Sequence, residues 1–372
     1  MDFSLSEEQK ILKNTGRDFF EKECPKSLVK EMARDELGYS PQLWRKMAEL
    51  GWMGLVLDPS YDGIGGSFLD LALLLEEMGR ALIPAPFFST VVLGALTIMA
   101  SGDEKNKQKL LPAIAAGSLI VTLGLTESDG HYSQEGIKTE AVLKGGDYII
   151  NGTKLFVPDA HIAQYVICVA RTANGGSTLF LVDTRSSGVT LTPLLTIAGD
   201  KQSEIIFDNV MVPSGHILGE IGSGWTYLEK VWPKIVVARC AEMVGGAQQV
   251  LDMTVQYAKE RHQFGRPIGS FQAIQHYLAD MLTEVEGCRH LTYQAAWLVS
   301  EDLPCKKEVA VAKSWCSDAF KKVTSVAHQV HGAIGFTEEH DLYLYYKHAK
   351  AWELMLGDAY RHREIVAQEM GL

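Results

Sequence analysis

One stretch of the sequence decides the fold, and it reads Tyr257-Ala258-Lys259-Glu260-Arg261-His262-Gln263-Phe264-Gly265-Arg266-Pro267-Ile268, continuing to Phe271-Gln272. It lies between two runs in which apolar residues recur at helical spacing. Each run presents one apolar face, the first made of Val244, Val250, Leu251, Val255 and Ala258, the second of Ile274, Tyr277, Met281, Val285 and Cys288. The stretch is therefore predicted to be a short join between two long helices.

The same helical spacing continues towards the C-terminus. Residues 309–331 predict a third helix, and residues 342–370 predict a fourth. Four long helices with short joins are typical of a bundle, so residues 225–372 are predicted to form a C-terminal four-helix bundle.

Upstream of the bundle, residues 119–224 have a different pattern. Short runs rich in β-branched and aromatic residues alternate with turn residues, as in Tyr148-Ile149-Ile150. Asn151-Gly152 follows that run directly and predicts a two-residue hairpin turn. We expect a compact, antiparallel β domain over 119–224.

The first third of the chain reads as helical. Ser6 and Gln9 form a capping-box pattern, and Ser40-Pro41 marks the start of another helix. The predicted fold class is therefore α+β. Its parts are an N-terminal helical domain (1–118), a middle antiparallel β domain (119–224) and the C-terminal four-helix bundle (225–372).

Composition excludes several classes of function. The chain has 372 residues and a net charge of −11, without a long basic run, which argues against nucleic-acid binding. The longest apolar stretch, 90–100, is too short for a membrane span. The first ten residues lack a secretory signal, and the six cysteines form no C-x-x-C pair. These features predict a cytoplasmic protein with reduced thiols and no zinc.

The common motifs of cofactor binding and hydrolysis are absent from the sequence. It contains no G-x-G-x-x-G, no P-loop, no H-E-x-x-H and no G-x-S-x-G. His328 and His331 could place two metal ligands on one helix face, but the sequence offers no evident third ligand. We therefore read this pair as a polar patch on a helix and predict no metal site.

The order of a helical block, a small β domain and a bundle resembles the acyl-CoA dehydrogenase family of flavoproteins. The resemblance covers nearly the whole chain, and its most specific part is the opening stretch, which matches Y-A-x-x-R-x-x-F-G-x-x-I followed by F-Q. Further matches are Leu125-Thr126-Glu127-Ser128, Asn151-Gly152-Thr153-Lys154, and residues 208–213, 219–225 and 329–336.

This resemblance implies an FAD site, and several residue types suit the cofactor. Arg261 offers a planar fork of donors for phosphate, and Phe264 offers a flat apolar face. The plainer alternatives are a surface salt bridge for Arg261 and core packing for Phe264. In the family such residues bind the FAD held mainly by a neighbouring subunit, which implies an oligomer. The predicted cofactor-binding residues are Thr126, Phe156, Arg261, Phe264, Gln272, Gln329 and Gly332.

The β domain departs from the family where the flavin ring would lie. Phe156 stands where the family often has a stacked Trp. Pro158 stands where the family usually has a hydroxyl bonded to flavin N5, and proline supplies neither a hydroxyl nor a backbone N–H. The family's G-x-G-S-D loop is also missing, because residues 129–135 read Asp-Gly-His-Tyr-Ser-Gln-Glu.

The family reaction needs a carboxylate that removes the α-proton of the thioester, and this chain lacks one at the family positions. The usual Glu position is Leu356, and a second family position falls near Ile235. Asp358 is the first in-chain candidate, although its plainer reading is a charge favoured by the N-terminus of a helix. Glu242 and Glu353 are weaker candidates, which we read as solvated helix charges.

Three hypotheses follow. The chain is the non-catalytic subunit of a heteromeric acyl-CoA dehydrogenase, with the base on a partner chain of the same family. Alternatively, it is a homo-oligomeric dehydrogenase with a relocated base. In the third, the fold performs a non-oxidative elimination on an acyl-CoA or only binds acyl-CoA. The resemblance also implies an electron-transferring flavoprotein as the electron acceptor.

Overall fold

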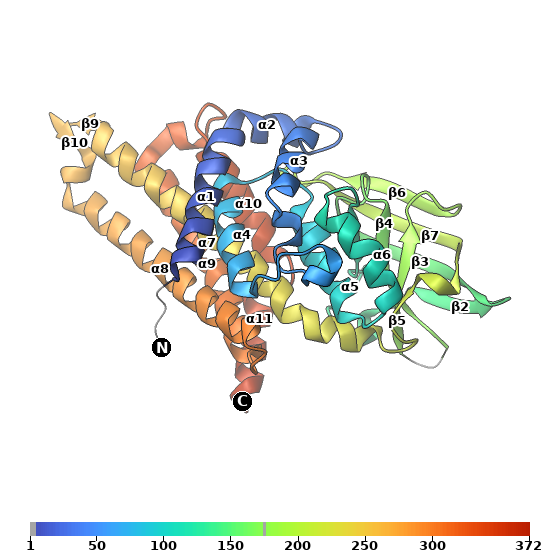
Figure 1. Ribbon diagram of the computed structural model, residues 1–372. Coiled ribbons are helices and arrows are strands. Elements are labelled where there is room, and N and C mark those ends of the chain that lie inside the picture. Colours follow the sequence, from blue (N-terminus) through green and yellow to red (C-terminus); the bar gives the residue numbers. More distant parts are fainter. Residues whose placement is uncertain (1–4, 174–175) are drawn as a thin grey trace. The chain divides into compact units, whose positions relative to one another are not determined.

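The computed structural model describes residues 5–173 and 176–372 of the chain, and these form two compact units (Figure 1). The bundle unit comprises residues 5–30, 67–83 and 236–372. The sheet unit comprises residues 31–66 and 84–235, without the two undescribed residues. The predicted division into three domains stays a prediction.

Long helices dominate the bundle unit. Gly79 of α4 and Gly245 of α7 let two of them touch backbone to backbone. A Cβ atom at Gly79 would lie 2.0 Å from the carbonyl oxygen of Glu242, and one at Gly245 would lie 1.7 Å from that of Glu76. The helices are α1 (Glu7–Glu23), α4 (Phe68–Ala81), α7 (Gly224–Glu260, in this unit from residue 236), α8 (Gln272–Ser300), α9 (Lys306–His331), α10 (Leu342–Leu354) and α11 (Ala359–Glu369).

The predicted fourth bundle helix, 342–370, is wrong in one respect, because it is two helices. Met355 is extended, and Leu356 and Gly357 have left-handed φ angles of 63° and 91°. Asp358 then starts α11 by accepting a hydrogen bond from the Arg361 backbone N–H. The apolar periodicity runs through the break, so sequence alone did not show it.

The sheet unit contains a sheet in the order β6-β7-β3-β2-β4-β5-β8, with β1 pairing to β4. Most pairs are antiparallel, while β1–β4 and the single β2–β4 bridge are parallel. This confirms the predicted α+β class. The strands are β1 (Val121–Gly124), β2 (Glu140–Lys144), β3 (Asp147–Pro158), β4 (Tyr165–Arg171), β5 (Ser177–Asp183), β6 (Val189–Leu194), β7 (Gln202–Val212) and β8 (Ile217–Leu218).

The hairpin turn predicted at Asn151-Gly152 is wrong. The turn lies at Gly145-Gly146, where Lys144 pairs with Asp147 and both glycines have positive φ angles, of 67° and 99°. Two positive φ angles are what a two-residue hairpin turn requires. Asn151-Gly152 instead lies inside β3, at an irregularity in its register with β7.

Shorter helices complete the sheet unit. Ser40 caps α3 as predicted, and its side chain accepts a hydrogen bond from the Leu43 backbone N–H. No described helix is long and apolar enough to span a membrane. All six cysteines are free thiols, and all but Cys305 are buried. The helices are α2 (Lys26–Arg34, in this unit from residue 31), α3 (Pro41–Glu49), the π-helical η3 (Phe88–Ala95), α5 (Leu96–Ala100) and α6 (Glu104–Ala115).

Candidate active site

The predicted base position lies in the break between α10 and α11. Leu356 is buried, with 8% of its surface exposed, and its φ angle of 63° is unusual for a branched residue. A non-glycine residue in this region costs about 1–3 kcal/mol and persists only where its surroundings enforce it. The second family position, Ile235, is also fully buried. Neither side chain can accept a proton.

Lys313 of α9 holds the break from below. Its ammonium donates hydrogen bonds to the carbonyl oxygens of Trp352 (3.3 Å), Glu353 (3.0 Å) and Gly357 (2.9 Å), and to the hydroxyl of Ser317 (2.9 Å). The side chain is fully buried, and this desolvation lowers the pKa of Lys313 to about 8. One lysine thus binds the end of α10 and the residue after Leu356.

His362 of α11 holds the break from the other side. Its Nε2 lies 3.0 Å from the carbonyl oxygen of Leu356. Burial lowers the pKa of His362 to about 4, so the imidazole is neutral near pH 7 and its Nε2–H donates to that carbonyl. Lys313 and His362 therefore fix the backbone around Leu356 without involving the leucine side chain.

The first in-chain base candidate, Asp358, acts as the N-cap of α11. Its carboxylate accepts a hydrogen bond of 2.9 Å from the backbone N–H of Arg361. An N-cap carboxylate satisfies an unpaired helix donor and is favoured by the helix dipole. This arrangement agrees with the plainer reading of Asp358.

The two weaker candidates are not solvated, contrary to our expectation. Glu353 forms ion pairs with Lys321 (2.5 Å) and Lys350 (3.5 Å). Glu242 is 9% exposed and lies 2.5 Å from the guanidinium of Arg239. Desolvation raises the pKa of Glu242 to about 7, although Arg239 opposes this rise. Helix faces that look solvated in the sequence are covered here by other helices.

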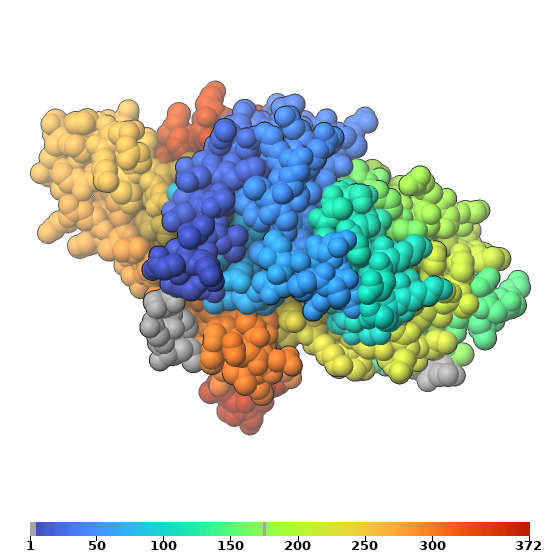
Figure 2. All heavy atoms as spheres, viewed as in Figure 1, coloured from blue at the N-terminus to red at the C-terminus, as the bar shows by residue number. Residues whose placement is uncertain are grey.

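Three of the predicted flavin ligands gather at the far end of α7 and α8. The hairpin of β9 (His262–Gln263) and β10 (Arg266–Pro267) turns at Phe264-Gly265. Phe264 is 92% exposed, so its reading as a core residue is wrong. Arg261 is exposed and has no ion pair among the described residues. The segment around 260–275, amber in Figure 2, presents the aromatic ring, the guanidinium and the amide of Gln272 on the surface.

Tyr257 links this tip to the end of α9. Its ring stacks on His331 at 4.3 Å between centroids, and its hydroxyl donates to the His331 carbonyl oxygen at 3.3 Å. Gln329 is exposed at the end of α9, and Gly332 directly follows that helix with a φ angle of 66°. His328 and His331 are both buried, so the predicted polar patch is wrong. Among the described residues, no group of three or more candidate ligands gathers around a metal site.

The sheet unit carries the remaining predicted residues. Thr126 follows β1, and its carbonyl oxygen accepts the Leu155 backbone N–H at 2.9 Å. Phe156 lies at a register shift in β3, 56% exposed and with a φ angle of 55°. Pro158 ends the strand two residues later. The bulge thus turns an aromatic ring outwards beside a residue that has no N–H to donate.

A buried ion pair supports this edge of the sheet. Lys154 is fully buried and lies 2.5 Å from Glu127. Glu127 also accepts hydrogen bonds from the Lys138 and Thr139 backbone N–H groups and from the Thr139 hydroxyl. Desolvation alone would raise the pKa of Glu127, but Lys154 and the backbone donors lower it. The pair fixes the loop after Thr126 against β3.

Three predicted site residues share a backbone feature that the sequence did not reveal. Phe156, Phe264 and Leu356 all have φ angles between 53° and 63°. Bulky residues rarely adopt this conformation, and it concentrates at functional positions. Sequence reasoning also missed Lys313, although a lysine among the apolar positions Val309 and Cys316 of one helix face was a usable signal.

Comparisons with known proteins cover the chain from end to end. Family models match the acyl-CoA dehydrogenase N-terminal domain (residues 6–118), middle domain (122–210) and C-terminal domain (222–371). The probable acyl-CoA dehydrogenase YngJ of Bacillus subtilis is 33% identical over 100% of both chains.

Two solved structures also match. A chain in the ChsE4–ChsE5 complex from Mycobacterium tuberculosis has a TM-score of 0.92 and 28% identity, covering 100% of this chain and 99% of that one. A chain in the structure of the electron transferring flavoprotein of Acidaminococcus fermentans has a TM-score of 0.92 and 31% identity, with the same coverage.

Proposed function

Because the chain belongs to the acyl-CoA dehydrogenase family, we propose that it serves in the α,β-dehydrogenation of an acyl-CoA thioester as a subunit of a heteromeric complex. A partner chain of the same family supplies the base. The observation that carries this proposal is the buried leucine at position 356, in the break where the family places its glutamate.

The chemistry explains why this position matters. The α-proton of a thioester becomes removable when its carbonyl oxygen accepts hydrogen bonds, and a carboxylate within hydrogen-bond reach must then take it. A leucine offers only its backbone, and the nearest alternative in sequence, Asp358, already caps α11. This chain is therefore suited to hold and orient a site, and unsuited to remove the proton.

The fit to FAD differs between the two units. The bundle unit presents an exposed guanidinium at Arg261 and an exposed ring at Phe264, which suit a phosphate and an aromatic group of the cofactor. The sheet unit offers Pro158 where a donor is needed. FAD would supply the hydride acceptor, while Arg261 and Phe264 of this chain would bind and orient the cofactor held by the partner.

Two relatives support the proposed partners. One structural match is a complex of two different chains, ChsE4 and ChsE5, which favours a hetero-oligomer. Another comes from an electron transferring flavoprotein structure, which favours such a flavoprotein as the electron acceptor.

The test compares the chain purified alone with the chain co-expressed with a second member of the family. Flavin absorbance and its bleaching by acyl-CoA are measured in both. We expect little flavin and no bleaching from the chain alone, and a yellow complex that acyl-CoA bleaches from the pair. A yellow, active homo-oligomer would contradict the proposal. Product formed without any electron acceptor would instead indicate the non-oxidative chemistry.

Two variants sharpen this test in the active complex. Asp358→Asn keeps the cap oxygen of α11 but removes the basic carboxylate, so we expect full activity. Loss of bleaching with FAD still bound would identify Asp358 as the base and support a relocated base. Arg261→Gln should lower flavin content in the co-expressed complex, while a matched change at exposed Arg363 on α11 should leave it unchanged.

A further inference from the structure

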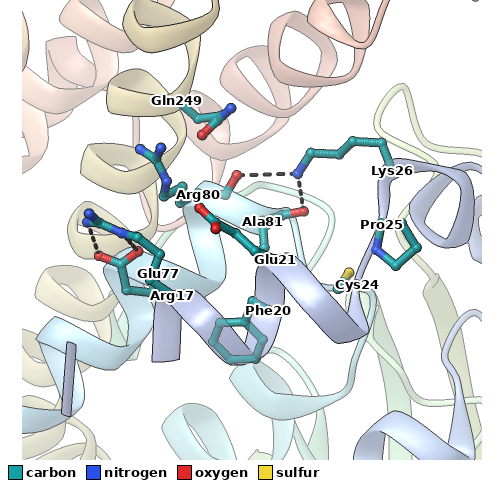
Figure 3. Close-up of a pocket in the computed structure, with 10 residues that line it drawn as sticks. All are labelled: Arg17, Phe20, Glu21, Cys24, Pro25, Lys26, Glu77, Arg80, Ala81 and Gln249. Atoms are coloured by element: carbon teal, nitrogen blue, oxygen red, sulfur yellow. Dashed lines mark hydrogen bonds and ion pairs between the residues drawn. The ribbon is translucent and has the colours of Figure 1, made fainter. Parts of the chain in front are cut away.

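A cavity of about 240 Å³ lies within the bundle unit, apart from the break at Leu356 (Figure 3). It is bounded by the end of α1, the turn that leads into α2, the end of α4 and one residue of α7, Gln249. A water molecule occupies about 30 Å³ in the liquid, so the cavity has room for a short acyl chain.

Lys26 extends into this cavity at the C-terminal end of α4. Its ammonium donates to the carbonyl oxygens of Arg80 (3.3 Å) and Ala81 (2.5 Å), the last residues of that helix. It also lies 5.1 Å from the ring centroid of Tyr345. Burial lowers the pKa of Lys26 to about 8, so a substantial fraction of the amine is neutral and nucleophilic near neutral pH.

The neighbouring charges leave Lys26 as the nucleophile of the cavity. Cys24 lines the same space, but burial raises the pKa of its thiol to about 11 and keeps it protonated. Arg17 is held by Glu77 through two hydrogen bonds, of 2.8 and 3.0 Å.

Arg80 offers a cation at the opposite wall from Lys26. One of its N–H groups donates to Asp252 at 2.7 Å, and its guanidinium lies beside Gln249 at the cavity (Figure 3). A fixed cation at this distance from the amine suits the negative oxygen that develops when a carbonyl is attacked.

We propose that Lys26 is an acyl-acceptor site that takes the acyl group of a short-chain acyl-CoA thioester. The amine attacks the thioester carbonyl, a C–N bond forms and the C–S bond breaks. Coenzyme A leaves as the thiol with the proton released by the amine, and an amide remains on Lys26. The step is a group transfer without oxidation or reduction, and it does not depend on which subunit supplies the base for dehydrogenation.

Acylation would change the end of α4. The amide carries no charge and retains one N–H, so Arg80 and Ala81 lose a charged donor that now binds both carbonyl oxygens. The same helix touches α7 at Gly79, where no side chain fits. The modification therefore weakens a helix end that packs directly on the bundle.

The test follows acylation residue by residue in the full-length protein. The chain is incubated with acetyl-CoA or butyryl-CoA, and peptide mass spectrometry quantifies the acyl amide at Lys26 and at Lys22, an exposed lysine one helical turn earlier. An ordinary lysine with a pKa of about 10.4 has roughly 200-fold less free amine at pH 7.5 than one at about 8, partly offset by its greater nucleophilicity. We expect Lys26 to react about tenfold faster than Lys22.

The pH profile and two controls decide the result. The rate at Lys26 should level off above about pH 8, while that at Lys22 keeps rising. In urea the two rates should converge, because the cavity is lost. Cys24→Ser should leave the Lys26 rate unchanged if the amine reacts directly. Equal rates at Lys26 and Lys22 in the folded protein, or a Lys26 rate that rises steadily to pH 10, would overturn the proposal.

Discussion

Glu242 provides the sharpest test of the electrostatics inside the bundle. Its carboxylate is buried beside Arg239, and burial raises its pKa from 4.5 to about 7. Each pH unit between the folded and unfolded pKa values corresponds to about 1.4 kcal/mol, so the ionised form costs about 3 kcal/mol in the folded state above pH 7. The folded chain therefore binds this proton more tightly than the unfolded chain.

The sign of the pH dependence follows directly. The contribution of Glu242 to stability is fully present below about pH 4.5 and is lost as the pH rises through about 7. Glu242→Gln removes the titrating group while keeping its shape. Relative to the native chain, the variant should gain stability between pH 5.5 and pH 8, by an amount approaching about 3 kcal/mol.

Infrared difference spectra between the native chain and Glu242→Gln provide the direct assay. The stretch of a protonated carboxyl group should be present at pH 5.5 and disappear with a midpoint near pH 7. Urea unfolding at the same pH values checks the energetic consequence. Glu364→Gln, on the exposed face of α11, is the matched control and should show neither effect. A midpoint below pH 5, or parallel stability profiles for the native chain and the Glu242 variant, would refute the reasoning.

Three further changes test the packing around the site by urea or thermal unfolding. Lys154→Met leaves the Glu127 carboxylate buried without its cation and should cost about 3–5 kcal/mol near pH 7. Because the pKa of Glu127 is lowered in the folded state, this loss should shrink as the pH falls through that value, and an unchanged loss at low pH would contradict the assignment. Gly79→Ala places a Cβ atom 2.0 Å from the Glu242 carbonyl oxygen and should cost about 1–3 kcal/mol, so a neutral effect would show that α4 and α7 can separate freely. Asp358→Ala removes the α11 cap and should cost about 1 kcal/mol, whereas Asp358→Asn should cost little.

The sequence predicted the element types well because helical and strand periodicities are local. The face of Val244, Val250 and Ala258 is buried in α7 as its spacing requires. It did not predict the break between α10 and α11, because apolar spacing continues across Met355 and Leu356. The break depends on Lys313 and His362, which bind the backbone from other helices, and no local pattern records such contacts.

Charged residues of the site were the least predictable part. A glutamate on an amphipathic helix is solvated in most settings, so Glu242 looked ordinary in sequence. Its burial follows from tertiary packing, with Arg239 one turn away and Trp352 of α10 5.1 Å from that guanidinium. Phe264 shows the opposite failure, because an aromatic residue that favours burial is exposed at the turn of a hairpin.

The backbone at Leu356 explains how a site can keep its shape while lacking its base. A left-handed φ angle is costly for any side chain with a Cβ atom, so the leucine does not create this conformation. The carbonyl oxygens of Leu356 and Gly357 are instead bound by His362 and Lys313. Leu356→Glu should therefore fold with the same break, whereas Lys313→Met should disrupt it even with the leucine in place. Hydrogen exchange of the amides at 355–361 distinguishes the two, and faster exchange in Leu356→Glu alone would show that the leucine side chain holds the break.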